Sequence, residues 1–522
     1  MDLLVKRIIS ILFLISSLSL LNPIDLFAEN NVITVYYNKE IGQMNKNIFG
    51  NNFLGYERNG HRYHGEECYD YSDYGAGLWD SVIKEPIKEV IDLAKESGMA
   101  VARFPGGCGT YHYNWKNAIG KYRKHFLYGL NEFLKTCKDI GVEPIITISY
   151  FEGDESDAAN LVEYLNTIDD SKHRWSAIRT KNGHKEPYNV KYFEIGNEDW
   201  QGDHENIKKV LPNEYANRYL KYYNAIKAID SSVKIGVILD GRYWNRGVLG
   251  VIKDKLDFGI IHIYPSPEVS DYVLEMMNAK DIFSITLGPA VLKGERDLQE
   301  ALKLLKEKSG KNVPLAITEY NGGFVQEKPV PYRYCLGTAL INAELLRIFM
   351  KPENNILMAN YWNFCNEYWG MVANGFDGEY KGLYKPYYKR SSYYIFELYH
   401  KHFGDILLGV DVRCDSYRIG MYNIPYLSVN VSKSKDGKKI FLMVVNKNIY
   451  KSISADLKLE GFVSAKKVDA WTLNGPSVDA TNEQNHDNIK VAYKTFEINN
   501  NPFEFNFEPH SLTAIEITKK EE

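Results

Sequence analysis

The sequence predicts an α/β protein in two parts, a (β/α)8 barrel of the TIM type followed by a β-sandwich. Between about residues 47 and 404, short apolar runs alternate with helical patterns, as they do in parallel barrels. From about residue 411 onward, short alternating strands follow one another without a helical period. The chain of 522 residues is long enough for two domains with separate cores.

The chain begins with a pattern typical of a secretory signal. Lys6 and Arg7 precede an apolar run over residues 8–21. We therefore predict that residues 1–28 are removed and that the protein is secreted or extracytoplasmic, without a membrane segment after cleavage. A membrane anchor is the alternative, but the apolar run is short for a bilayer span and breaks at Pro23.

The barrel prediction depends on a count of strands. Eight apolar runs are centred on Ile48, Ala102, Ile146, Phe193, Val237, Ile261, Ile317 and Tyr361. Helical patterns cover residues 81–97, 126–139, 156–166, 213–229, 295–308, 333–350 and 391–402. This alternation favours a closed barrel over an open doubly wound sheet. No GxGxxG turn follows any of these strands, so a dinucleotide-binding fold has no support.

The second domain is predicted over residues 405–522, which leaves residues 47–404 for the barrel. Its strands are expected at residues 426–431, 439–445, 454–459, 467–473 and 512–517. Residues 29–46 contain one more alternating strand, NVITVYY, which has no partner in the barrel count. We expect this N-terminal strand to join the sandwich.

Composition limits the classes of partner. Charged residues make up 25% of the chain and the net charge is only −4, so no nucleic-acid partner is expected. The six cysteines lack CxxC spacing, so no metal site is predicted, although one or two disulfides remain open. The 39 tyrosines and 8 tryptophans offer faces that stack on sugar rings, but such residues also fill cores. The oligomeric state is not defined by the sequence.

Two of the predicted strands end near a glutamate. The strand at residues 192–195 is followed by Asn197 and Glu198, and the strand at residues 314–320 carries Glu319 near its end. In a parallel barrel these strand ends meet at one mouth. Two carboxylates there are what glycoside hydrolysis requires, one as acid/base and one as nucleophile. A solvated strand end is the alternative for either glutamate alone, but the pair favours catalysis.

Polar residues at other strand ends could serve the same mouth. Arg103 could keep the nucleophile ionised, and Tyr264 or His262 could donate hydrogen bonds to it. A structural ion pair is the alternative for Arg103, and a satisfied barrel histidine is the alternative for His262. The glycines after Phe104 would let the backbone pass close to a ligand. Cys108 in this turn is assigned to substrate binding, and no cysteine-protease signature suggests a nucleophile.

Two tryptophans are candidate platforms for a sugar. Trp115 follows the glycine-rich turn, and Trp362 on the last predicted strand could form a floor beneath the substrate. A core aromatic is the alternative for both. Glu367, Asp240 and Asp199 also lie close to strand ends, where loop or rim positions are the simpler interpretation.

Together these motifs resemble a clan A glycoside hydrolase and are most similar to the family 51 α-L-arabinofuranosidases. The resemblance is carried by RFPGGC at 103–108, YNWK at 113–116, EIGNE at 194–198, HIY at 262–264, ITEY at 317–320, HFGD at 402–405 and PHSLT at 509–513. It implies a retaining double displacement on an oligo- or polysaccharide, without a cofactor. It makes Glu198 the acid/base and Glu319 the nucleophile. It further makes Asn197 a ligand of the sugar 2-hydroxyl and Tyr264 a partner of the nucleophile.

The chain departs from that family where the sugar is selected. The first strand reads FGNNFL from Phe49 and lacks the glutamate of the family's YGHFxE pattern, with Glu57 out of step. The last strand, YWNFCN from Tyr361, lacks the usual glutamine context. We expect an α-L-arabinofuranosidase with its two carboxyls about 5–5.5 Å apart. The alternatives are another clan A β-glycosidase or endo-glycanase, and a non-catalytic carbohydrate-binding relative, which the intact glutamates disfavour.

Overall fold

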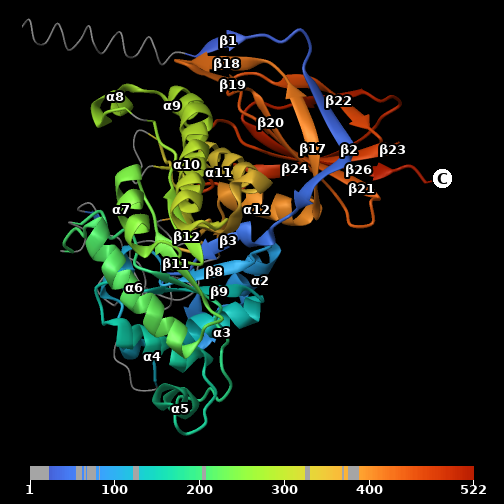
Figure 1. The fold of residues 1–522 in the computed structure, drawn as a ribbon. Helices are drawn as coiled ribbons and strands as arrows, with labels where there is room; N and C mark the ends of the chain where they lie inside the picture. The colour runs from blue at the N-terminus through green and yellow to red at the C-terminus, as the bar shows by residue number, and fades with distance from the viewer. Residues whose placement is uncertain are drawn as a thin grey trace, which may run out of the picture.

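The computed structural model confirms the predicted TIM barrel with a C-terminal domain of strands (Figure 1). It describes residues 23–54, 62–63, 66–67, 78–80, 83–120, 128–202, 207–267, 269–323, 330–366, 369–373 and 387–521. Most of the predicted signal, together with Glu57 and Glu367, lies outside the described residues. In the part of the chain that is described, no helix has the length and apolar character needed to cross a bilayer.

The barrel closes through parallel strands in the order β10-β11-β12-β13-β14-β3-β8-β9. Their bounds are Gly50–Asn52 (β3), Val101–Phe104 (β8), Glu143–Ile148 (β9), Tyr192–Ile195 (β10), Lys234–Ile238 (β11), Phe258–Ile263 (β12), Leu315–Tyr320 (β13) and Ile356–Tyr361 (β14). All eight strands were predicted, but the first lies later than expected. Ile48 belongs to a 3-10 turn, η1 (Lys46–Ile48), because the Asn45 side chain accepts the Asn47 N–H and starts a helical turn there.

Helices cover the outside of the barrel (Figure 1). Their bounds are Lys88–Glu96 (α2), Leu130–Ile140 (α3), Glu155–Asn166 (α4), Arg174–Lys181 (α5), Pro212–Ile229 (α6), Arg242–Ile252 (α7), Asp271–Met276 (α8), Ala279–Ile285 (α9), Val291–Ser309 (α10), Leu336–Phe349 (α11) and Ser391–Lys401 (α12). The patterns did not predict α5, α7, α8 and α9. In α7, Gly247 and Gly250 lower the helix propensity, and packing against α6 and α10 compensates.

The C-terminal domain is built on one large sheet in the order β24-β23-β26-β21-β20-β17-β2-β22-β25. The strands are Val32–Gln43 (β2), Ile406–Arg413 (β17), Leu427–Lys433 (β20), Lys439–Asn446 (β21), Ile453–Glu460 (β22), Ser464–Asn474 (β23), Lys490–Glu497 (β24), Phe503–Phe507 (β25) and Ser511–Lys519 (β26). Phe496 on one edge strand packs on Phe503 and Phe505 of the other. The sheet therefore curls into two facing layers, and β2 lies inside it between β17 and β22.

Besides the barrel and the large sheet, the described residues form several smaller sheets. A three-stranded sheet combines Ile24–Leu26 (β1), Ser416–Ile419 (β18) and Tyr422–Pro425 (β19). Two-stranded pairs are formed by Arg62–Tyr63 (β4) with Glu66–Glu67 (β5), Trp79–Asp80 (β6) with Glu85–Pro86 (β7), and Val372–Ala373 (β15) with Tyr388–Lys389 (β16). The strand β1 falls within the predicted signal segment.

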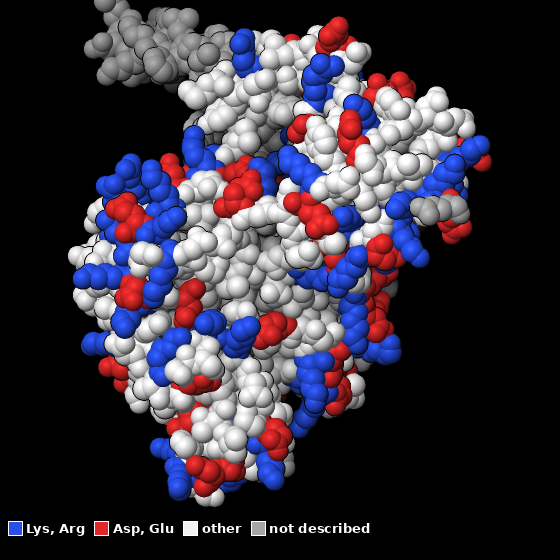
Figure 2. Space-filling model, turned by 45° about the vertical axis from the view of Figure 1, so that its right-hand side comes forward, with Lys and Arg blue, Asp and Glu red and all other residues white. Residues whose placement is uncertain are grey.

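Helix α11 joins the barrel to the large sheet (Figure 1). It contacts β20, β21 and β26 as well as α10 and α12, and nearly all of its residues are buried. A helix that is apolar on all sides is typical of such a position. On the outer surface, lysines and arginines are interspersed with acidic residues over the face that Figure 2 shows.

Candidate active site

The mouth of the barrel brings two predicted glutamates together. Glu198 follows the end of β10, Glu319 lies on β13, and His262 lies between them on β12. One ligand atom from each of these three side chains lies within 4.8 Å of the others. Glu198 and Glu319 lie 121 residues apart in the chain. They come together because the C-terminal ends of the strands of a parallel barrel all lie at the same mouth.

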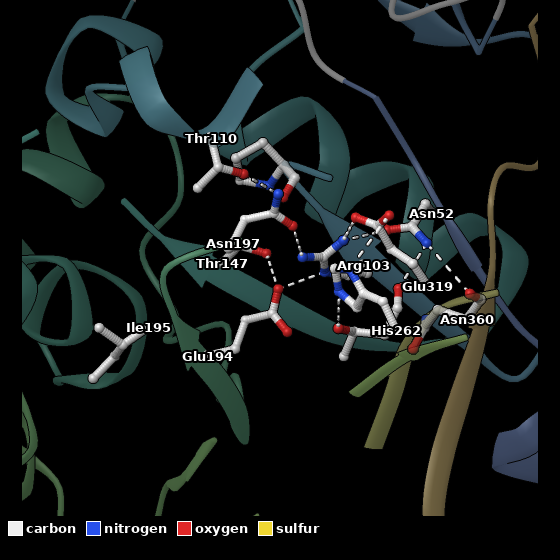
Figure 3. A network of polar contacts seen from close by, with 12 residues as sticks. Asn52, Arg103, Thr110, Thr147, Glu194, Ile195, Asn197, His262, Glu319 and Asn360 are labelled. Carbon is white, nitrogen blue, oxygen red and sulfur yellow. Dashed lines mark hydrogen bonds and ion pairs between the residues drawn. The ribbon is translucent and has the colours of Figure 1, made fainter. Parts of the chain in front are cut away.

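Arg103 on β8 is the centre of the polar contacts at the mouth (Figure 3). Its Nη1 donates to Glu319 Oε1 at 2.8 Å and to Asn52 Oδ1 at 3.0 Å. Its Nη2 donates to Asn197 Oδ1 at 2.8 Å, and its Nε donates to Glu194 Oε1 at 2.5 Å. The arginine is fully buried at the base of the mouth and pairs with Glu194 and with Glu319, one of the two predicted catalytic glutamates.

The second oxygen of Glu319 is bound from the other side. Tyr264 donates its hydroxyl to Glu319 Oε2 at 2.7 Å, and His262 Nδ1 lies 3.6 Å from the same oxygen. Glu319 therefore has a donor on each carboxylate oxygen, and its side chain is only 6% exposed. Contacts on both oxygens hold the carboxylate in one orientation.

Glu198 has different surroundings. Its Oε1 lies 2.7 Å from His262 Nδ1, and its Oε2 accepts from Gln201 Nε2 at 2.5 Å. Its backbone has a φ of 48°, and Gly196 before it has a φ of 85°, where a Cβ would collide with Asp199. This sharp turn after β10 directs the side chain of Glu198 toward the mouth. The side chain of Glu198 is 15% exposed.

The local charges shift several pKa values. Burial alone would lower the pKa of His262, but the charges of Glu319 and Glu198 outweigh burial and raise it. Burial likewise opposes the charge of Arg103, yet Glu194 and Glu319 raise its pKa. Burial raises the pKa of Asp199, which lies beneath the turn, well above its usual range. The mouth thus retains its positive charges next to two carboxylates.

Two further predicted site residues, Trp362 and Cys108, lie beside the glycine pair that follows β8. Trp362 is half-buried at the end of β14, with its ring against Gly106 and Gly107, where no side chain could fit. Cys108 begins the 3-10 turn η3 (Cys108–His112) beside this glycine pair. The prediction that Trp362 borders the mouth is thus compatible with its position, and its role in binding stays a prediction.

Trp115 is not brought to the carboxylates. It lies in the 3-10 turn η4 (Trp115–Ala118), where it is 7% exposed and packs edge-on against Trp175 and against Tyr164. These partners belong to the outer helices α5 and α4. The position of Trp115 fits the packing alternative, because α4, which was predicted, and α5, which was not, cover the ring.

Sequence reasoning missed several polar residues of the mouth. They are Asn52, Thr147, Glu194, Gln201 and Thr318. Glu194 carried a signal, because a charged residue inside an otherwise apolar strand must have a partner when buried. Thr147 in β9 and Thr318 in β13 carried none, because a threonine is ordinary in a strand.

A cavity of about 810 Å³ opens beside the mouth. His262 and Tyr264 form part of its wall, and it continues past Trp200 along α7 and α10. Asp240 lines this cavity, consistent with the rim position expected for it, whereas Asp199 is buried under the β10 turn. Glu198, His262 and Glu319 are the one set of described residues whose atoms could surround a metal ion, and the absence of a metal stays a prediction.

Comparison with known proteins gives one consistent family. Residues 94–281 match the family model of the alpha-L-arabinofuranosidase 1 domain, and residues 318–511 match that of the alpha-L-arabinofuranosidase C-terminal domain. The chain is 25% identical to a probable alpha-L-arabinofuranosidase C of Aspergillus niger over 82% of this chain and 87% of that protein. It is 24% identical to an intracellular exo-alpha-L-arabinofuranosidase of Bacteroides ovatus over 85% and 90%.

Solved structures show the same fold. The alpha-L-arabinofuranosidase of Thermotoga maritima in complex with arabinose superposes with a TM-score of 0.74 at 23% identity, covering 94% of this chain and all of that one. A family 44 xyloglucanase of Paenibacillus polymyxa gives a TM-score of 0.60 at 15% identity, covering the same 94% of this chain and all of its own. The two family models together span most of the chain, including both glutamates. The chain therefore belongs to the clan A glycoside hydrolases, in the α-L-arabinofuranosidase family 51.

Proposed function

We propose that the protein is a retaining α-L-arabinofuranosidase in which Glu319 is the nucleophile and Glu198 is the acid/base. The observation that carries the proposal is the carboxylate pair at the mouth, with an oxygen of each within 4.8 Å. Retaining glycosidases hold their carboxyls close, whereas inverting ones leave room for a water between them. The short separation supports the retaining mechanism.

The contacts of Glu319 suit the nucleophile. Arg103 and Tyr264 donate to its two oxygens, so the carboxylate is fixed in orientation. In the first step Glu319 attacks the anomeric carbon of the sugar, and the bond from that carbon to the leaving oxygen breaks. Glu319 is then covalently bound to the sugar as an ester.

The contacts of Glu198 suit the acid/base. In the first step it gives its proton to the leaving oxygen, and in the second step it takes a proton from water. That water attacks the anomeric carbon and releases Glu319. Glu198 is more exposed than Glu319, which leaves it access to the leaving group and to water. His262 bridges the two carboxylates and could stabilise Glu198 while it is ionised.

The identity of the sugar needs its own argument, because the same mechanism serves other clan A enzymes. The names of the relatives favour arabinofuranose, and Asn197, the residue proposed to bind the sugar 2-hydroxyl, is held at the mouth by Arg103. In the first-strand pattern Leu54 stands at the position of the family's glutamate. Asn52, two residues earlier, accepts from Arg103 and donates to backbone carbonyls of β13 and β14. The fold shared with a xyloglucanase keeps an endo-glycanase as the second candidate.

We also propose export of the protein on the basis of its N-terminal pattern, with an oligo- or polysaccharide outside the cytoplasm as substrate. The Bacteroides ovatus relative is named as intracellular, so the family alone does not fix the compartment. Mass spectrometry of the protein recovered from outside the cytoplasm would show an N-terminus near residue 29. An intact N-terminus retained in the cytoplasm would refute export.

The test of the function is a panel of aryl glycosides led by the α-L-arabinofuranoside, with Glu319→Ala alongside the wild type. Release from the arabinofuranoside, abolished in the variant, supports both the sugar and the nucleophile. Azide should restore turnover in Glu198→Ala with an activated substrate and yield a glycosyl azide of retained configuration. Release from another glycoside alone would refute the sugar, and inversion of the anomeric configuration would refute the mechanism.

A further inference from the structure

We propose that Glu194 is a positioning residue for the glycosidase reaction, which fixes the orientation of Arg103 and balances its charge so that Glu319 stays a strong nucleophile. The inference rests on the proposed function of Glu319. Glu194 lies on β10, four residues before the acid/base, which follows the end of that strand. Its side chain is buried in the barrel and touches neither carboxylate of the pair directly in the described contacts.

Glu194 is committed to Arg103 by geometry. Its Oε1 accepts from Arg103 Nε at 2.5 Å and from Thr147 Oγ1 at 2.6 Å. Both Glu194 and Arg103 are fully buried, with 0% of either side chain exposed. Its Oε2 is buried without a hydrogen-bond partner among the described residues. Burial of a carboxylate costs free energy unless the carboxylate is paired. Buried charges of this kind cluster at functional sites, so the pair next to the proposed nucleophile points to a functional role for Glu194.

The guanidinium contacts explain what the orientation does. The group is planar and rigid, so one anchored edge fixes the direction of the other nitrogens. Glu194 holds the Nε edge, and the two terminal nitrogens then point at Glu319 and Asn197 (Figure 3). These are the proposed nucleophile and the proposed ligand of the sugar 2-hydroxyl. Glu194 therefore sets the positions of two substrate-facing groups through one arginine.

The charge of Glu194 has a second consequence. Arg103 stands between two carboxylates, and Glu194 neutralises it from the side away from substrate. Without that charge, the full positive charge of Arg103 would act on Glu319. Such a carboxylate ionises more readily, but it is a weaker nucleophile toward the anomeric carbon. A balanced arginine orients the nucleophile without making it unreactive.

The other titratable groups near this pair are few. Burial raises the pKa of Asp199 and of Tyr215 well above the usual range, and the charge of Glu194 raises both further. His262, Tyr264 and Glu198 face Glu319 from β12 and from the turn after β10. Among the described contacts, the hydrogen-bond partners of Glu194 are Arg103 and Thr147, so its substitution acts on the mouth chiefly through Arg103.

The test compares pH profiles of kcat/KM for Glu194→Gln and the wild type on the aryl glycoside that the wild type cleaves. Glutamine keeps an oxygen for Arg103 Nε and Thr147 but lacks the charge. We expect the acid limb to move about one pH unit lower. We also expect kcat to fall about tenfold, with KM changed less than threefold. Thr147→Val, which removes a hydrogen bond and keeps the charge, should leave the acid limb in place.

Each outcome bears on the proposal. A Glu194→Gln profile that superposes on the wild type, with only thermal stability reduced, would overturn it and leave a structural role. Should Glu194→Gln not fold, Glu194→Asp retains the charge on a shorter side chain, and it should lower kcat at an unchanged acid limb. Full kcat in Glu194→Asp would overturn the positioning role. A wild type that cleaves no glycoside in the panel would overturn the proposed function first, and this inference with it.

Discussion

Two buried ionic clusters in this protein show how differently charge can be used inside one chain. The mouth cluster consists of Arg103, Glu194, Glu319 and Asn197, and it lies at the C-terminal ends of the barrel strands. The interface cluster consists of Glu344, Arg347, Ser428 and Lys447, and it joins α11 to β20 and β21. Both clusters remove charged side chains from water, which costs free energy unless ion pairs and hydrogen bonds offset it.

The interface cluster pairs both oxygens of its carboxylate. Arg347 Nε and Nη2 donate to the two oxygens of Glu344 at 3.2 and 3.1 Å, and Ser428 Oγ donates at 3.1 Å. Lys447 Nζ lies 3.5 Å from Glu344 and donates to Ser428 at 2.6 Å. The cluster borders a cavity of about 680 Å³ lined by α10, α11, β17 and β20, and its contacts hold α11 against the large sheet.

The mouth cluster is left open. Asn197 Nδ2 and Glu194 Oε2 are buried without a hydrogen-bond partner among the described residues. An unpaired buried donor is costly in a purely structural network. At a barrel mouth it is a place where a substrate hydroxyl can bind. The comparison teaches that completeness of pairing, rather than burial or charge alone, separates a structural cluster from a functional one.

The largest effect is expected from Arg103→Met, which removes the centre of the mouth cluster. Glu194 and Glu319 would be left buried without a counter-charge, and we expect kcat/KM to fall about 10³-fold or more, with about 3–5 kcal/mol of stability lost. Steady-state kinetics and urea unfolding measure the two losses. Arg103→Lys keeps the charge but not the planar fork, so it should recover stability more than activity. Activity near that of the wild type in Arg103→Met would break the comparison.

The matching substitution at the interface is Glu344→Ala. It leaves Arg347 and Lys447 buried without their carboxylate, so we expect about 3 kcal/mol of stability to be lost. The kcat of the folded protein should stay within about twofold of the wild type, because no mouth residue is touched. Urea unfolding and kcat measured on the same preparation test this, with the exposed Glu353→Ala as the control. A large loss of kcat would show that the two clusters are coupled.

The sequence predicted these two clusters to different extents, for a physical reason. The mouth is encoded locally, because β10 and β13 each carry a glutamate at a strand end and the barrel brings strand ends together. The fold and the carboxylate pair could therefore be anticipated. Glu194 stood in the quoted motif but its role depends on Arg103 from another strand, which no single stretch reveals.

The interface cluster and the tryptophans were beyond such reasoning. Glu344 lies on a helix whose other residues are almost all apolar, and Lys447 follows a strand more than a hundred residues later. Only the docking of α11 on the large sheet makes them partners. Trp115 was misjudged because its neighbours in the chain suggested the mouth, while its neighbours in space are on α4 and α5.

A smaller effect follows from pH. Burial raises the pKa of Glu344, but the charges of Arg347 and Lys447 outweigh burial and lower it to about 2. A carboxyl with a depressed folded-state pKa contributes stability above its unfolded-state pKa and loses it as pH falls toward the folded-state value. We expect roughly 2–3 kcal/mol to be lost between about pH 4.5 and pH 2. Glu344→Gln should lack this component, so equal acid sensitivity of both proteins would contradict the assignment.

The smallest effects are expected from substitution of Trp115 and Trp362. The two substitutions test whether nearness to the active-site motifs in the chain or nearness to the mouth in the structure determines the effect on catalysis. Trp115 packs in the outer layer and its Nε1 has no partner among the described residues, so Trp115→Phe removes no hydrogen bond. We expect kcat/KM within about twofold of the wild type and about 1–2 kcal/mol of lost stability.

Trp362→Phe is the matched change, where the ring lies over Gly106 and Gly107 and is half-buried. There we expect the reverse, with kcat/KM lowered about tenfold and stability nearly unchanged, because a smaller ring offers less surface to a sugar. Kinetics and thermal unfolding on both variants decide the matter. If Trp115→Phe lowered kcat/KM more than Trp362→Phe, the assignment of Trp115 to the packed outer layer and of Trp362 to the mouth would be wrong.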